Sequence, residues 1–121
     1  MTNDYESDRL LSEYLLLHYG EAADVMPYTF GPSDALHFPR RCVDELLQRD
    51  MLGPQATALD LGCALGRSSF ELACHCAEVT GIDLSQRFIE TARTLAEQGR
   101  FDYWFIEEGN MRTPCTFQPP P

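Results

Sequence analysis

Residues 58–67 read ALDLGCALGR, and residues 81–85 read GIDLS. The first stretch begins with a short apolar run at 57–61, typical of a buried parallel strand, and continues into a loop bracketed by Gly62 and Gly66. Residues 67–76 then show helical spacing, and 77–82 predicts a second strand. Glycine lacks a Cβ, so the loop can adopt positive φ and a ligand can approach its backbone closely. The pattern predicts the ligand-binding edge of an open α/β sheet.

Two features of the loop indicate which ligand it would hold. A dinucleotide fingerprint, G-x-G-x-x-G, needs a second glycine where this chain has Ala64, which disfavours a nicotinamide dehydrogenase. Asp60 lies two positions before Gly62, where a carboxylate suits a cofactor carrying an ammonium and a sulfonium better than a pyrophosphate. The loop therefore favours S-adenosylmethionine, with Asp60, Gly62 and their neighbours at its methionine end.

Asp83 follows the second predicted strand, 23 residues after Asp60. A carboxylate at that strand's end can accept hydrogen bonds from both ribose hydroxyls. Asp83 could instead begin a turn and cap the next helix, although Ser85 is an equally good cap. Taken with the glycine loop, the ribose interpretation is favoured, with Leu84 beside it.

The same motifs, together with aromatic ones further upstream, carry a family resemblance. Residues 60–66 and 81–85 resemble the first two motifs of class I S-adenosylmethionine-dependent methyltransferases. Residues 8–20, 27–32, 38–42 and 66–72 are similar to the 4-mercaptohistidine methyltransferase of ovothiol biosynthesis, and the likeness covers about residues 5–110. This resemblance implies methyl transfer to an imidazole ring nitrogen of 4-mercaptohistidine. The alternative kept open is a non-catalytic cofactor-binding or interaction module.

The resemblance also implies further site residues. Tyr28, Phe30 and His18 are substrate-pocket candidates, with ordinary packing as the alternative. Asn110 and Met111 follow the third predicted strand, where such enzymes often carry an acid for the adenine amino group; Glu107 and Glu108 are alternatives. Cys63 and Ala64 are expected to touch the cofactor through the loop backbone. No catalytic residue is predicted.

The order of the predicted elements defines the architecture. Helices are expected at 5–19, with a possible capping box from Asn3 and a stop at Gly20, and at 39–51, opened by Pro39. After a break at 53–54 the order is β-α-β-α-β, with strands at 57–61, 77–82 and 101–106 and a helix at 86–98 that Gly99 ends. We expect a Rossmann-like α/β fold with a parallel sheet.

This division gives an N-terminal helical cap with an aromatic loop (1–52), a cofactor-binding part (53–112) and a disordered proline-rich tail (113–121). Prolines exclude the tail from a central strand. The resemblance implies about seven strands, of which three are predicted, so we expect an incomplete sheet. Its unpaired edge at strand 57–61 would invite association.

Composition limits the remaining classes. The 121 residues carry a formal charge of −10, which argues against nucleic acid and anionic membranes as main partners. No stretch approaches the roughly 20 apolar residues that span a bilayer. Five cysteines without a secretory signal predict reduced thiols and a cytoplasmic location. Residues 74–76, Cys-His-Cys, lack a second ligand pair, so no metal site is expected.

Overall fold

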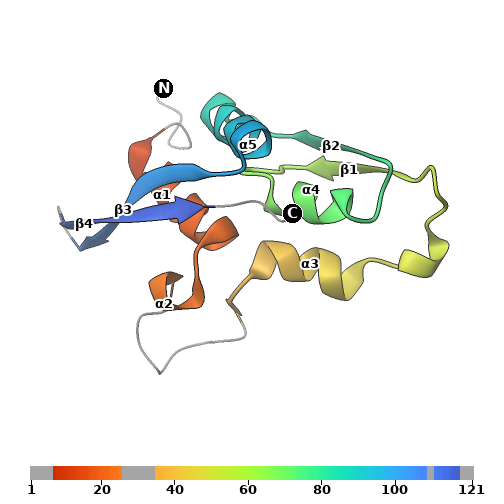
Figure 1. Ribbon diagram of the computed structural model, residues 1–121, viewed down its shortest axis with the longest axis horizontal. Helices are drawn as coiled ribbons and strands as arrows, with labels where there is room; N and C mark the ends of the chain where they lie inside the picture. Colours follow the sequence, from red (N-terminus) through yellow and green to blue (C-terminus); the bar gives the residue numbers. More distant parts are fainter. Residues whose placement is uncertain (1–6, 26–34, 109–110, 118–121) are drawn as a thin grey trace.

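A computed structural model describes residues 7–25, 35–108 and 111–117. In chain order the elements are α1 (Asp8–Tyr19), α2 (Ala22–Val25), α3 (Phe38–Leu46), the 3-10 helix η3 (Arg49–Met51), β1 (Thr57–Leu61), α4 (Arg67–Ala73), β2 (Glu78–Ile82), α5 (Gln86–Gln98), β3 (Phe101–Glu108) and β4 (Met111–Phe117) (Figure 1). The α/β class predicted from the sequence is confirmed.

The two strands on either side of the glycine loop form a parallel pair. Thr57 pairs with Glu78 and Leu61 with Ile82, in unbroken register. Ala77 extends the ladder by donating to the Ala56 carbonyl at 2.8 Å. Helix α4 packs on this sheet and α3 packs on α4, so one side of the sheet carries two helical layers (Figure 1). This β-α-β unit places the loop between β1 and α4 beside the end of β2.

The third strand departs from the prediction. The sequence predicts residues 101–106 as the third strand of a parallel sheet, but β3 pairs antiparallel with β4 in a separate two-stranded sheet. Antiparallel strands need only a short connection, and Glu108 at the end of β3 pairs with Met111 at the start of β4. The expected three-stranded parallel sheet is therefore wrong, and two strands make up the parallel part among the described residues.

The expected disordered tail is also corrected for part of its length. Residues Met111–Phe117 form β4, with Pro114 opposite Trp104. Proline cannot donate to a ladder, but a two-stranded sheet consists of edge strands, where proline is tolerated. Residues 118–121 lie outside the described part of the chain.

The helices lie where their local signals predict them, with differences at their ends, such as α4, which ends at Ala73 and not at 76. Ser7 caps α1 by accepting from the Leu10 amide at 3.2 Å, while the capping box expected from Asn3 lies outside the described residues. Helix α3 ends at Leu46, five residues before the predicted end, and η3 follows it. Leu46, the last residue of α3, is 75% exposed.

The main core is formed by α1, α5 and the glycine loop. Its buried members are Leu11, Leu15, Tyr19, Ala64, Leu65, Phe88 and Leu95. Phe101 and Tyr103 of β3 pack against this cluster, so the hairpin covers α1 rather than extending the parallel sheet. The loop is therefore held in the interior of the molecule by Leu65, which is fully buried.

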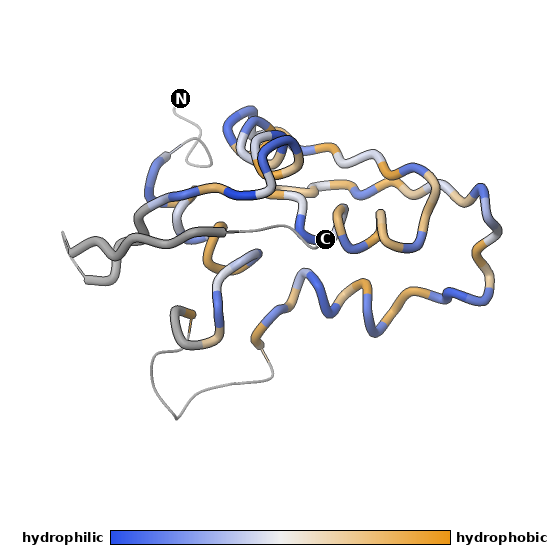
Figure 2. The backbone as a smooth tube through the Cα atoms, in the orientation of Figure 1, coloured by the Kyte–Doolittle hydropathy of each residue, from blue (hydrophilic) through white to orange (hydrophobic). Residues whose placement is uncertain are grey.

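The face of the parallel sheet opposite to α4 is exposed, and its apolar part lies at the strand ends next to the glycine loop. Hydrophilic positions interrupt the hydrophobic ones along both strands (Figure 2), and the exposed positions also include Thr57, Glu78 and Thr80. Leu59, Leu61 and Ile82 are 58%, 73% and 51% exposed, and the register puts Leu61 beside Ile82. Asp60 and Gly81 point the other way, towards α4. None of the described helices is long and apolar enough to cross a bilayer.

Candidate functional site

The glycine loop is a tight turn fastened to the end of β2. The amides of Gly62 and Cys63 both donate to the Ile82 carbonyl, at 2.7 and 3.0 Å, and Gly66 donates to the Cys63 carbonyl at 2.9 Å. Gly62 and Gly66 have φ of 71° and 84°, a region that costs glycine little. Gly66 then serves as the N-cap of α4. These two positions explain why the loop needs glycine at its ends.

Ala64 adopts the left-handed conformation as well, with φ of 47°. A Cβ in this region costs roughly 1–2 kcal/mol. The conformation turns the Ala64 amide towards the Asp83 carboxylate, and the N to Oδ2 distance is 2.9 Å. The strain at Ala64 therefore accompanies a hydrogen bond that joins the loop to the residue after β2.

Asp83 holds both the loop and the next helix. Its Oδ1 accepts from the Ser85 amide at 2.9 Å, while Oδ2 accepts from Ala64. The turn-forming interpretation of Asp83 is thus realised in the structure. A carboxylate has about four lone-pair positions, so two acceptor positions remain for a ligand.

A pocket of about 550 Å³ opens where the loop, the end of β2 and α1 meet. This volume is within the usual range of small-molecule sites. Its lining is apolar with a single carboxylate and consists of Tyr14, Gly62, Ala64, Ile82, Asp83, Leu84, Ser85 and Phe88. Four of the predicted cofactor residues, Gly62, Ala64, Asp83 and Leu84, are thereby brought together.

Three other predicted residues lie away from this pocket. Cys63 and Gly66 line a second pocket of about 370 Å³ between α4, β2 and α5. Asp60 accepts from the Ser69 hydroxyl of α4 at 2.7 Å, on the opposite face of the sheet. A ligand contact by Asp60 stays a prediction, and its visible role is to fix α4 against β1.

The remaining predicted residues fall at or beyond the described ranges. Tyr28, Phe30 and Asn110 lie outside the described residues. Met111 begins β4, and the alternatives Glu107 and Glu108 end β3. The proposed adenine and substrate contacts of these residues stay predictions.

His18 lies on α1 beside the loop. Its Nδ1 accepts from the Arg67 amide at 3.4 Å, which leaves the proton of the neutral ring on Nε2. Burial, and to a smaller extent the Arg67 charge, lower the His18 pKa to about 4, although the Asp83 charge partly opposes this shift. The imidazole is therefore neutral near pH 7 and adjoins the start of α4.

Two aromatic residues of the pocket were not predicted as site residues. Tyr14 of α1 and Phe88 of α5 have ring centroids 4.9 Å apart and close the pocket on the side of the core. Tyr14 and His18 are four residues apart in one helix, so they share a face. That spacing was the available signal for Tyr14, whereas Phe88 looks like any core residue in the sequence.

The thiol of Cys63 is unsuited to nucleophilic chemistry. Burial, together with the neighbouring Asp60 and Asp83 carboxylates, raises its pKa to about 11. A protonated thiol is a poor nucleophile. Among the described residues, no group of three or more His, Cys, Asp or Glu side chains is arranged to hold a metal ion.

The part of the chain that carries most of this pocket matches a known protein family. A family model described as a methyltransferase domain matches residues 58–118, which is half of the chain and runs from β1 through the loop, Asp83 and β3 to the end of β4. The chain belongs to this methyltransferase family. Its members typically bind S-adenosylmethionine. No curated protein matches the chain significantly.

Membership supports S-adenosylmethionine-dependent methylation in general. The family match begins at Ala58, so the aromatic motifs of the N-terminal region, which carry the mercaptohistidine resemblance, lie outside it. The family match therefore supports the activity class, whereas the substrate is supported by the resemblance of the N-terminal motifs alone.

Proposed function

We propose that the chain binds S-adenosylmethionine in the 550 Å³ pocket and serves methyl transfer to an imidazole ring nitrogen of 4-mercaptohistidine. The observation that carries the cofactor part is the Asp83 carboxylate. Two backbone amides hold it at the end of β2, beside a glycine loop of a methyltransferase family.

The pocket residues fit the parts of this cofactor. The remaining acceptor positions of Asp83 suit the ribose hydroxyls. Ile82 and Leu84 offer apolar surface for the adenine ring, and Leu84 is almost fully exposed until a ligand covers it. The absence of bulky side chains at Gly62 and Ala64 lets the ligand approach the loop backbone. The aromatic face of Tyr14 can attract a sulfonium cation.

The substrate part of the proposal rests on the resemblance of the N-terminal motifs. In this chemistry a neutral ring nitrogen attacks the methyl carbon in line, the carbon–sulfur bond of the sulfonium breaks, and the ring then loses a proton to water. Most of the acceleration comes from holding the two reactants in line. Tyr14 places α1 at the pocket, which supports a substrate position against this helix, and His18 lies one turn further along it, outside the pocket lining.

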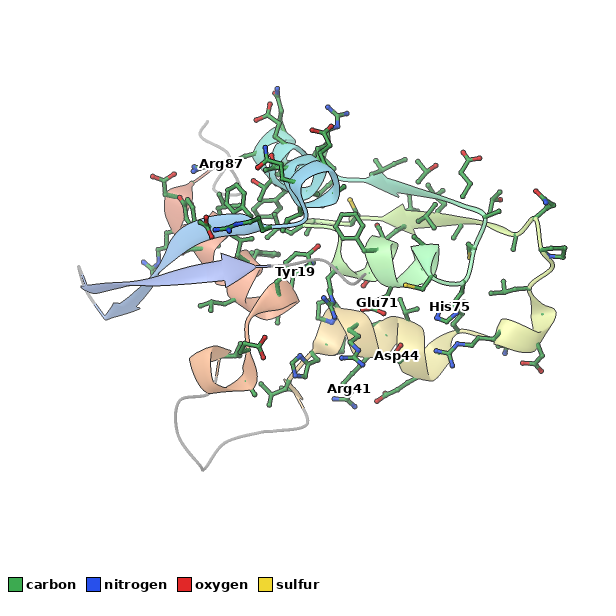
Figure 3. The ribbon with its side chains drawn as sticks, in the orientation of Figure 1. Tyr19, Arg41, Asp44, Glu71, His75 and Arg87 are labelled. Atoms are coloured by element: carbon green, nitrogen blue, oxygen red, sulfur yellow. The ribbon has the colours of Figure 1, made fainter. Side chains whose placement is uncertain are left out.

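Calorimetric titration of S-adenosylmethionine tests the cofactor site. Asp83→Ala is expected to weaken binding at least about tenfold, because the ribose loses its acceptor and the loop loses its anchor. Asp44→Ala is the matched control: this α3 carboxylate pairs with Arg40 and Arg49 (Figure 3 labels Asp44). Equal affinities for wild type and Asp83→Ala would overturn the assignment.

An activity assay tests the substrate. The chain is incubated with methyl-labelled S-adenosylmethionine and either 4-mercaptohistidine or histidine, and the products are identified by mass spectrometry. We expect label in the imidazole ring of 4-mercaptohistidine. Cofactor binding with no transfer to either compound would reject this substrate while leaving the cofactor site intact.

The exposed sheet face favours a second candidate, a non-catalytic interaction module. Leu59, Leu61 and Ile82 would be covered if the chain associated through this side of the sheet. Light scattering over a range of concentrations, with Leu59→Lys as the comparison, tests it. A wild-type protein that is monomeric at all concentrations and transfers methyl groups would exclude this candidate.

A further inference from the structure

Tyr19, in the last turn of α1, makes a buried contact with the glycine loop. Its hydroxyl donates to the Leu65 carbonyl at 2.7 Å, across 46 positions of the chain. Tyr19 is only 9% exposed and does not line the candidate cofactor pocket. A buried carbonyl that lost its donor would keep the cost of its desolvation. The contact therefore restrains the loop at Leu65, one residue after the amide that Asp83 holds.

The restraint acts next to Ala64, the residue of the loop with an unfavourable backbone conformation. Leu65 follows Ala64, which is in the left-handed conformation. Asp83 holds the amide of Ala64, and Tyr19 holds the carbonyl of the next residue. An unfavourable backbone conformation persists only when its surroundings fix it. The two hydrogen bonds together fix the backbone of residues 64 and 65, the first of which lines the pocket.

The Tyr19 ring has a separate set of contacts. The Arg67 guanidinium lies over the ring, 5.6 Å from its centre, and also pairs with Glu71 at 3.0 Å. Figure 3 shows Tyr19 on α1 and Glu71 in the space between α4 and α3. Burial raises the Tyr19 pKa, so the hydroxyl remains a donor at ordinary pH. Because ring and hydroxyl have different partners, replacing tyrosine by phenylalanine removes the loop contact alone.

We propose that Tyr19 is a positioning residue, whose hydroxyl holds the glycine loop in its cofactor-binding conformation without touching the cofactor. The role rests on the proposed S-adenosylmethionine site. In this arrangement α1 is part of the binding apparatus, although the family match begins only at residue 58. Affinity for the cofactor then depends on a helix that precedes the whole matched region.

The test compares Tyr19→Phe with Tyr103→Phe. Tyr103 also loses a hydroxyl contact in this change, since its oxygen accepts from Arg87 at 3.1 Å, but it lies in β3 away from the pocket lining. Both variants are expected to melt a few degrees below wild type. Only Tyr19→Phe is expected to raise the Kd for S-adenosylmethionine, by about tenfold. Equal Kd values for the two variants would overturn the proposal.

Amide hydrogen exchange gives a readout that needs no cofactor. In Tyr19→Phe, the amides of Cys63, Ala64 and Gly66 should exchange faster, while those of α5 keep the protection they have in Tyr103→Phe. Unchanged loop protection would show that the hydroxyl does not restrain the loop. If wild type fails to bind the cofactor, the proposed function fails, yet faster loop exchange would still support the restraint.

A loss of folding in Tyr19→Phe would not leave the question open. Trimethylamine N-oxide favours the folded state without binding a specific site, so both variants and wild type are measured in it. Loop exchange that stays faster than in Tyr103→Phe under these conditions supports the proposal, and matching exchange contradicts it.

Discussion

Ala64 is the residue where the loop departs furthest from ordinary backbone preference. Its φ of 47° occurs together with the hydrogen bond from its amide to Asp83, so the conformation anchors the loop but lowers the stability of the fold. Glycine at this position would adopt the same conformation freely. The sequence alone indicated that Ala64 disfavours a dinucleotide and lies in the cofactor loop, but not that its backbone is left-handed.

We therefore expect Ala64→Gly to stabilise the fold. Relief of the left-handed strain should raise the free energy of unfolding by about 1–2 kcal/mol. The greater conformational entropy of glycine in the unfolded chain should lower it by about 0.5–1 kcal/mol. The net increase in the free energy of unfolding should be about 0.5–1 kcal/mol, measured by urea denaturation. Ala96→Gly on α5 is the control and should destabilise by about 1 kcal/mol. A loss of stability in Ala64→Gly would show that Ala64 is unstrained.

At the scale of the element, α5 carries the clearest local signals. It begins at Gln86 and ends at Gln98, as predicted, because Ser85 accepts from the Phe88 amide at 3.1 Å and Gly99 takes φ of 74° after the last turn. Ser85 is fully buried and its own amide donates to Asp83. The cap of α5 thus also lines the candidate cofactor pocket.

Ser85→Ala should lower the free energy of unfolding by about 1 kcal/mol, the usual value of an N-cap. Ser7→Ala, at the cap of α1, is the comparison and should cost a similar amount. The two differ in binding, since only Ser85 lines the pocket. Urea denaturation and cofactor titration of both variants check this. A cost at Ser85 well below that at Ser7 would contradict the capping role.

Local signals predicted β1 at its observed bounds and β2 to within one residue, since strand and helix periods, caps and glycines depend on neighbouring residues. They did not predict the partner of β3, because strand pairing depends on residues distant in the chain. They also missed β4, because the prolines that begin at Pro114 indicate, from the local sequence alone, a C-terminal segment without a strand. For the site, Gly62 and Asp83 were recognisable from spacing, whereas Phe88 joins the pocket only through tertiary packing.

At the scale of the molecule, stability should depend on pH through His18. Its pKa is about 4 in the folded state and near 6.5 when unfolded, so below pH 6.5 the unfolded chain binds more protons. Stability is therefore lost as the pH falls from 6.5 towards 4. Between pH 7 and pH 5 the loss from this residue should be about 1–2 kcal/mol.

The measurement is urea denaturation of wild type and His18→Gln at several pH values. Glutamine can still accept the Arg67 amide but does not titrate. The difference between the two curves isolates His18 from the acidic residues, which contribute equally to both. Curves that run parallel between pH 7 and pH 5 would contradict a buried neutral His18.

The burial of the Cys63 side chain has one more consequence. Cys63 is only 6% exposed, and its sulfur packs against Gly81 of β2. A reagent therefore reaches the thiol only when the loop opens. Cys74, by contrast, is exposed and marks the rate of unhindered labelling. The rate at which Cys63 is alkylated relative to Cys74, measured by peptide mass spectrometry, therefore reports how often the loop opens. A ligand that seals the neighbouring pocket should slow the labelling of Cys63 while leaving that of Cys74 unchanged.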